Sequence, residues 1–297
     1  MKPMHFRNFL AIDWSGALGE RQKGIALALC TRGEEAPRLL APPGHARWSR
    51  ADVLDLLAGH LPPDTLVGMD LGISLPFADA GAFFPGWAQS PPDARALWAL
   101  IDAVCAPDPH LAAASFVDHD DLSAYFRRHG GREGVQFHLP GALHKRGRMR
   151  VTEAAQARAG CKPYSNFNLV GAAQVGKSSL TGMRLLHRLG GRLPVWPIDP
   201  LPARGSLVVE IYTTLAAVAA GRTAGRAKMT DHAALDAALV RLGSRPAGGS
   251  GAIDDHSADA LVTAAWLRTA AHRAELWHPG ELTPELAATE GWTFGAP

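Results

Sequence analysis

The sequence is poor in cysteine and has no long apolar run. Its 297 residues include three cysteines, Cys30, Cys105 and Cys161, which are scattered and odd in number. Such cysteines do not form a zinc knuckle and are typical of reduced thiols, so we expect a cytoplasmic protein. No apolar segment is long enough to cross a bilayer, and residues 1–9 lack the apolar core of a signal peptide. We therefore expect no membrane partner.

The chain also has little net charge and lacks several hydrolase motifs. Thirty Lys and Arg residues against 28 Asp and Glu give a formal charge of +2, which by itself does not imply nucleic-acid binding. No Ser-His-Asp nucleophile elbow, zinc-hydrolase helix motif or internal repeat is present. A composition with 47% hydrophobic and 20% charged residues is typical of a soluble globular protein. We expect a single domain over residues 1–297.

The first quarter of the chain predicts one half of a mixed sheet. Apolar runs bounded by turn residues predict strands at 8–13, 24–30, 38–41 and 66–70. Ser49 is a suitable N-cap for a helix over 50–60, which lies between the third and fourth strands. The glycine-containing connector 15–23 predicts that the first two strands form a hairpin. This order is typical of an α/β protein.

After the fourth strand the pattern loosens. Repeated prolines over residues 77–165 predict an insertion of helices and loops, or a lid, within the domain. The acid-rich run 118–121 favours a helix cap over a metal site. Periodicity predicts a strand at 207–212 and helices at 93–104, 122–128, 179–189, 214–220, 231–242 and 255–273.

Acidic residues stand where predicted strands end. Asp13 and Asp70 follow apolar runs directly, and Glu210 lies within a third run. Three further polar residues, Asp255, His256 and Asp259, share one face of the last long helix. Each acid has a structural interpretation, as a turn residue or as a partner of the helix dipole. An acid at a buried strand end needs a partner, however, and together the four segments predict a site for divalent metal.

Residues Gly171–Ser178 match the phosphate-binding loop of nucleoside triphosphatases. Two glycines are followed by Lys177 and Ser178, with an apolar stretch before them and a predicted helix after them. Only one convincing strand follows, and no later apolar run ends in an aspartate that would hold magnesium. A nucleotide-binding protein or NTPase is therefore the alternative to a metal-dependent enzyme, and the loop also suits a phosphate of another ligand.

The most basic part of the chain is residues 127–150. It includes Lys145, Arg146, Arg148 and Arg150, with two phenylalanines nearby. Such a run is either a solvated loop or a surface that holds a phosphate backbone beside an acidic centre. The sequence leaves both interpretations open.

Five short segments, in this order, resemble the ribonuclease H-like superfamily. More closely, they resemble the domain-of-unknown-function 429 family of predicted nucleases. The segments span most of the chain: Ala11–Gly16, Gly68–Pro76, Ala173–Gly176, Val209–Tyr212 and Asp255–Leu261. The last one also resembles the final helix of Holliday-junction resolvases. Thr213 stands where this family usually has proline, which affects the turn more than the chemistry.

The resemblance implies a five-stranded mixed sheet, with its first three strands antiparallel, flanked by helices. It implies metal ligands at Asp13, Asp70, Glu210 and Asp259, assisted by His256 or Asp255. The expected activity is phosphodiester hydrolysis in nucleic acid with two Mg²⁺ or Mn²⁺ ions. Phosphate contacts are expected from Lys145, Arg146, Arg148 and Lys177. A catalytically silent protein of the same fold is a further alternative, whereas actin-like ATPases of this superfamily need two copies of the fold.

Overall fold

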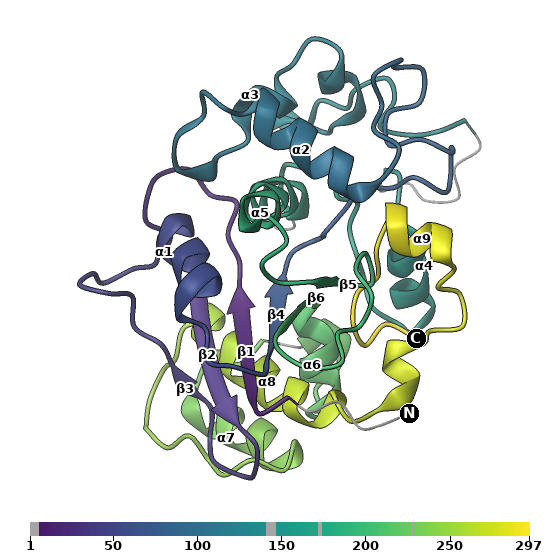
Figure 1. Cartoon of the computed structure of the whole chain (residues 1–297). Helices are drawn as coiled ribbons and strands as arrows, with labels where there is room; N and C mark the ends of the chain where they lie inside the picture. Colours follow the sequence, from purple (N-terminus) through teal and green to yellow (C-terminus); the bar gives the residue numbers. More distant parts are fainter. Residues whose placement is uncertain (1–5, 141–146, 172–173, 227) are drawn as a thin grey trace.

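The structure is a computed structural model that describes residues 6–140, 147–171, 174–226 and 228–297 (Figure 1). The described residues form a six-stranded sheet of order β3-β2-β1-β4-β6-β5. Its strands are β1 (Asn8–Asp13), β2 (Ala26–Thr31), β3 (Arg38–Leu39), β4 (Thr65–Asp70), β5 (Val195–Trp196) and β6 (Leu207–Glu210). The first three strands pair antiparallel, as expected, and β1, β4, β6 and β5 pair parallel.

The expectation of five strands was wrong because β5 adds a sixth at the edge. This strand has only two residues and is followed by Pro197. Proline lacks the N–H that a central strand needs, but it is tolerated beside an edge strand. The sequence analysis found only one convincing strand after the Gly171–Ser178 segment, and it missed the short edge pairing of β5 with β6.

Helices follow most of the predicted periodic segments. They are α1 (Arg50–Asp55), α2 (Ala94–Val104), α3 (Ala114–Val117), α4 (Val151–Arg158), α5 (Val175–Leu189), α6 (Thr213–Ala219), α7 (His232–Arg241), α8 (Asp255–Ala270) and α9 (Pro284–Thr289). A π-helical turn, Leu56–His60, continues α1, and short 3₁₀ turns punctuate the loops. Within the described ranges, no helix is both long and apolar enough to cross a membrane.

Several helices differ from the prediction. The helix expected over 122–128 is only a 3₁₀ turn, Leu122–Tyr125. The acid-rich run 118–121 was expected to cap it. Asp121, at the cap position, makes no capping hydrogen bond and instead accepts one from the Trp87 indole at 3.2 Å. Helix α5 begins at Val175 rather than at 179. Helices α3, α4 and α9 were not predicted.

The sheet separates two hydrophobic cores. Side chains alternate between the faces of a strand, so Leu10 and Ile12 of β1 join one core while Phe9 and Ala11 join the other. Helices α1, α2 and α5 contribute to the first core, and α6, α7 and α8 contribute to the second. In Figure 1, α5 lies above the arrowheads of β1 and β4, and α8 lies lower, beside the strands. The ends of β1 and β4 thus lie between two helical layers.

Candidate metal centre and adjoining cavities

Asp13 and Asp70 end two neighbouring parallel strands and are partners in the register between β1 and β4. Asp13 has the same parity along its strand as Ala11, and Asp70 has the same parity as Leu66. Both apolar residues belong to the core that α8 covers. The two carboxylates therefore leave the sheet on the same side, which the convergence expected from the sequence requires.

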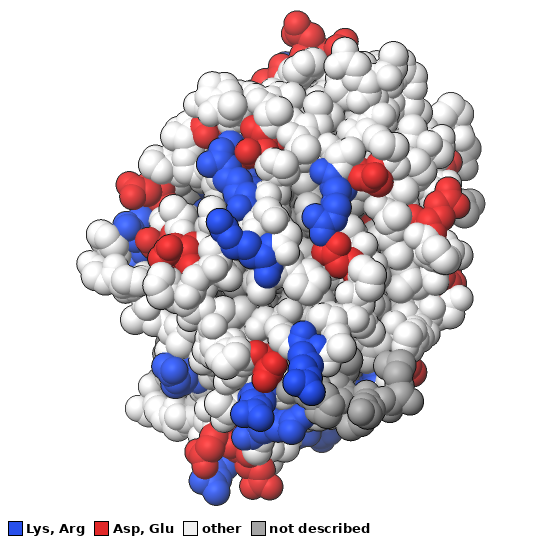
Figure 2. Space-filling model, in the orientation of Figure 1, with Lys and Arg blue, Asp and Glu red and all other residues white. Residues whose placement is uncertain are grey.

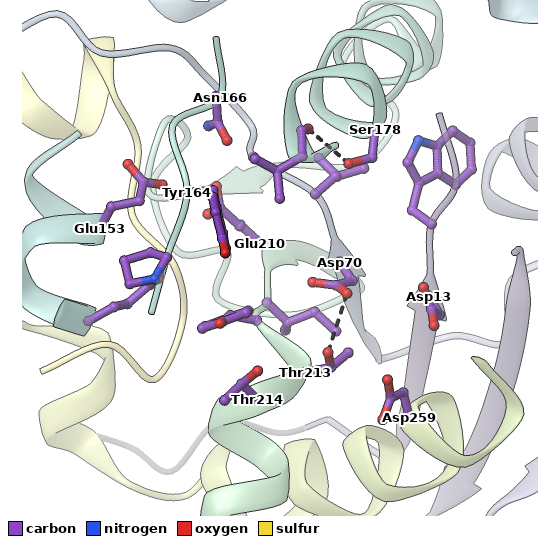
Figure 3. Close-up of a pocket in the computed structure, with 18 of the residues that line it drawn as sticks. Asp13, Asp70, Glu153, Tyr164, Asn166, Ser178, Glu210, Thr213, Thr214 and Asp259 are labelled. Carbon is purple, nitrogen blue, oxygen red and sulfur yellow. Dashed lines mark hydrogen bonds between the residues drawn. The ribbon is translucent and has the colours of Figure 1, made fainter. Parts of the chain in front are cut away.

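Helix α8 brings His256 and Asp259 to the same place. The Asp254 side chain caps the helix by accepting a backbone N–H in its first turn. His256 Nδ1 then lies 3.0 Å from Asp13 Oδ2. Figure 3 shows the carboxylate of Asp259 facing the same space as those of Asp13 and Asp70. Residues 246 positions apart in the chain, Asp13 and Asp259, thus meet at one site.

These side chains line one end of a cavity of about 380 Å³. We call this end, formed by Asp13, Asp70, His256 and Asp259, the acidic end. Further lining residues come from α4 and from the segment before α5, and Figure 3 shows Tyr164 and Asn166 across Asp70 from Asp13. We call this second part, formed by Gln156, Tyr164 and Asn166, the amide end. No sequence pattern singled out its residues, because uncharged side chains in an irregular segment carry no spacing signal.

Burial raises the pKa of each carboxyl group at the acidic end. The pKa of Asp70 lies well above its ordinary value because of burial first and then the charges of Asp13 and Asp259. Burial, followed by the charges of Asp13 and Asp255, raises the pKa of Asp259 to about 7. Burial also raises the pKa of Asp13, against the hydrogen bond from His256, and that bond raises the pKa of His256. The group repels its own negative charge and favours a bound cation.

Glu210 lies on the opposite side of the sheet. It is level with Met69 rather than with Asp70, and Met69 belongs to the core under α5. Both carboxylate oxygens are held by the Arg150 guanidinium, at 2.5 and 2.8 Å. Thr293 Oγ1 donates to one oxygen at 2.5 Å and the Ile73 N–H donates to the other at 2.8 Å. This environment does not favour the expected role of Glu210 as a metal ligand.

Arg150 joins several buried acids into one network. Besides Glu210, it contacts Glu153, and its Nη1 donates to the main-chain oxygen of Glu290. Burial raises the pKa of Glu153 to about 7, although the Arg150 charge opposes the shift. Burial raises the pKa of Glu290 as well, although three backbone N–H groups donate to its carboxylate. Arg150 therefore stabilises the fold beside the cavity and is not a surface cation.

The donor chemistry of the acidic end fits a hard divalent cation. Among the described residues, Asp70 is hydrogen-bonded only by Thr213, whose Oγ1 lies 3.4 Å away, and Asp259 accepts no hydrogen bond. Carboxylate oxygens are preferred ligands of Mg²⁺ and Mn²⁺. Asp255, an expected ligand, instead pairs with Lys228. Over the described ranges, no group of three or more His, Cys, Asp or Glu side chains has a geometry that would hold a metal ion as it stands.

The described parts of the Gly171–Ser178 segment do not resemble a phosphate-binding loop. In residues 165–170, which precede it, only Asn168 forms a bridge, and no strand is present. The hydroxyl groups of Ser178 and Ser179 donate to the Val175 carbonyl oxygen within α5. Residues 172–173 lie outside the described residues. The strand that the nucleotide-binding interpretation requires is therefore missing from the described part of this segment.

The expected phosphate contacts are distributed differently from the prediction. Arg148 is 2% exposed, and its guanidinium donates to Asp79 and to backbone carbonyl oxygens, so a phosphate cannot reach it. Lys145 and Arg146 lie outside the described residues. Lys177 lines a second cavity, of about 240 Å³. Three more basic residues on its walls belong to the stretch 127–150 but were not among the named contacts. We call the four the basic cavity: Arg128, His129, Arg132 and Lys177.

Gly16 separates the two cavities. A Cβ on this residue would lie 2.3 Å from the Lys177 carbonyl carbon and 2.4 Å from the Ser178 nitrogen, so only glycine allows this approach. Ser178 lines the cavity with the acidic end, whereas Gly16 and Lys177 line the basic cavity. The turn after β1 thus packs directly on the start of α5, and the two cavities adjoin this one contact.

Comparison of the chain with protein-family models, with curated proteins and with solved structures found no match. The site itself combines carboxylates that favour a bound cation, a neighbouring histidine and an adjoining basic cavity.

Proposed function

We propose that this protein is a metal-dependent phosphodiesterase that acts on nucleic acid and has a ribonuclease H-like fold. The strand order β3-β2-β1-β4-β6, with three antiparallel strands followed by parallel pairing, supports that fold. In this interpretation β5 is an added edge strand. Two expected acids, Asp13 and Asp70, stand at adjacent strand ends in this order.

The observation that carries the proposal is an excess of carboxylates around one cavity. Six described lining acids face only two permanent cations and one histidine: Asp13, Asp70, Glu153, Glu210, Asp255 and Asp259 against Arg150, Lys228 and His256. Glu153 and Glu210 are held by Arg150. Asp13, Asp70 and Asp259 therefore would hold Mg²⁺ or Mn²⁺. Such a cation activates water and stabilises the leaving oxygen of a phosphodiester.

The other residues of the acidic end have distinct roles in this proposal. His256 is fixed by its 3.0 Å contact with Asp13 and is half-buried, so it can hold or move a proton at the edge of the site. Thr213 orients the Asp70 carboxylate through its hydroxyl group. Glu210 acts as a positioning residue, because it ties the Arg150 network to the Ile73 N–H just after β4.

A local basic surface supports an anionic polymer as substrate. On the face drawn in Figure 2, Lys and Arg side chains are interspersed with Asp and Glu, in keeping with the net charge of +2. The basic cavity adjoins the other cavity at Gly16. In this proposal it holds one phosphate while a neighbouring phosphate lies at the acidic end. Mixed charge elsewhere would leave the remaining surface neutral on average.

The test compares cleavage of labelled oligonucleotides with Mg²⁺, Mn²⁺ or EDTA by the parent and by Asp13→Asn and Asp70→Asn. We expect metal-dependent cleavage that each substitution lowers by at least about a hundredfold, because a transition-state charge loses its counter-ion. Asp120→Asn is the matched control, since Asp120 is exposed and lines neither cavity. Metal-independent cleavage, or full activity in Asp70→Asn, would refute the proposal.

A further inference from the structure

The amide end of the cavity holds two buried side-chain amides whose oxygens are unused. Asn166 and Gln156 are each 3% exposed, and both line the cavity. Asn166 Nδ2 donates to the Ser74 carbonyl oxygen at 2.9 Å, and Gln156 Nε2 donates to Thr293 Oγ1 at 2.9 Å. From described residues, neither side-chain oxygen accepts a hydrogen bond, and neither is among the fully enclosed atoms that lack a partner.

The orientation of both amides is fixed by their partners. Ser74 offers Asn166 a carbonyl oxygen, which only accepts, so the NH₂ group of Asn166 must face it. The Thr293 hydroxyl proton goes to Glu210, so its oxygen accepts from Gln156. Rotating either amide group by 180° would place its oxygen against the oxygen that now accepts from its NH₂ group. The cavity therefore presents two preset hydrogen-bond acceptors.

An aromatic surface stands beside these acceptors. Tyr164 is 41% exposed and lines the cavity together with Pro163 and Tyr212. Figure 3 shows the Tyr164 ring between Asn166 and Thr214, with Asp70 to one side. Gly72, two residues after Asp70, is in close contact with Asn166, because a Cβ on Gly72 would lie 2.2 Å from Asn166 Nδ2. The Asn166 amide thus packs directly on the turn that follows Asp70.

We propose that the amide end binds one unstacked nucleobase that carries an exocyclic amino group. This inference rests on the proposed function, because the phosphate of the same nucleotide then lies at the acidic end. A base is flat, stacks on an aromatic ring and presents donors at its edge, which the Tyr164 ring and the two amide oxygens match. A volume of about 380 Å³ lies within the range of small-molecule sites. Single-stranded nucleic acid is therefore the substrate, since a paired base cannot enter.

Cytosine and uracil provide a matched pair of ligands. They differ at C4, where cytosine has an amino group and uracil has a carbonyl oxygen that two acceptors would repel. We expect oligodeoxycytidylate to be cleaved about 5- to 150-fold faster than oligodeoxyuridylate of equal length, the range for one well-made base contact. We also expect the single strand to be cleaved at least about tenfold faster than its fully paired duplex, because unpairing costs a few kcal/mol that the site does not return.

Tyr164→Ala tests the stacking surface, and Tyr164→Phe restores the ring without the hydroxyl. We expect the alanine variant to lose about 5- to 150-fold in affinity and cleavage rate on the single strand, and the phenylalanine variant to stay within about threefold of the parent. Val218→Ala is the control, because Val218 is also 41% exposed and does not line the cavity.

Binding of cytidine and uridine 5′-monophosphate in EDTA separates this inference from the proposed function. Stronger binding of cytidine monophosphate that Tyr164→Ala removes, in a protein that cleaves nothing, would support the base site and refute the nuclease. Metal-dependent cleavage with equal rates on cytosine, uracil and duplex substrates, unchanged in Tyr164→Ala, would overturn the base site and leave the nuclease standing. Absence of both cleavage and selective nucleotide binding would overturn both.

Discussion

Replacing Asp259 by asparagine should stabilise the metal-free protein while removing its metal site. Burial and the charges of Asp13 and Asp255 raise the pKa of Asp259 from 3.8 to about 7. Each pKa unit corresponds to about 1.36 kcal/mol, so the ionised carboxylate destabilises the fold by at most about 4 kcal/mol. Partial contact with water lowers this value, and we expect a gain of about 1–4 kcal/mol for Asp259→Asn above pH ~7.

The pH dependence fixes the sign of this effect. Between pH ~4 and pH ~7 the folded state holds a proton on Asp259 that the unfolded state has released, so the unfolding free energy of the parent falls as pH rises. The destabilisation by ionised Asp259 is therefore complete above pH ~7 and absent below pH ~4. Asparagine carries no charge at any pH. The variant should therefore match the parent near pH ~4 and exceed it near pH ~8.

Urea unfolding in EDTA at these two pH values measures the difference. A variant that is less stable than the parent at the higher pH, or whose gain is the same at both, would refute the reasoning. Asp120→Asn should change little at either pH, because Asp120 is exposed. Adding Mn²⁺ at a hundredfold its dissociation constant should reduce the advantage of the variant by about 2.7 kcal/mol, because the parent alone keeps the complete metal site.

Two further predictions concern the arginines and the basic cavity. Arg150→Met should lower the unfolding free energy by about 3–5 kcal/mol in urea titrations, because it leaves Glu153 and Glu210 buried without their partner. The control is Arg158→Met, which removes the exposed pair of Arg158 and Glu281 and should cost under about 1 kcal/mol. Serine at the three Lys and Arg positions of the basic cavity should lower the slope of log affinity against log salt by about 2–3 on single-stranded DNA, at 0.7–0.9 per lost contact. An unchanged slope would mean that nucleic acid does not enter this cavity. The control protein carries serine at the exposed positions Arg38, Arg204 and Arg245.

The positions of Asp13 and Asp70 could be predicted from the sequence because each follows an apolar run directly. Two such acids at the carboxyl ends of parallel neighbours must lie at one edge of the sheet. Glu210 also follows an apolar run, but the residues before it, Leu207–Val209, are buried on both faces of the sheet. A continuous apolar run shows no alternation, so the sequence does not reveal which face the next residue takes. The pairing of β4 with β6 determines the face, because Glu210 is level with Met69 and not with Asp70.

The positive charge near residue 148 could not be assigned from the sequence for a different reason. A run of basic residues indicates charge but not burial. Arg148 is buried because carbonyl oxygens of Pro76, Ala82 and Phe83, distant in sequence, surround its guanidinium. The basic cavity likewise combines α5 with a loop some fifty residues earlier, which no local pattern predicts.

The packing of α8 has a consequence for synthesis of the chain on the ribosome. The β1–β2 hairpin is made first, yet one of its apolar faces is covered by a helix that is made more than two hundred residues later. At a synthesis rate of about 5–20 residues per second, this apolar face stays exposed for some tens of seconds before α8 is made. Cys30 lies on it, and its thiol donates to the Ala264 carbonyl oxygen once α8 has docked. Burial then raises the pKa of Cys30 to about 11, so its thiol ionises less readily in the folded protein than in the nascent chain. The same docking of α8 brings His256 to Asp13 and so completes the acidic end.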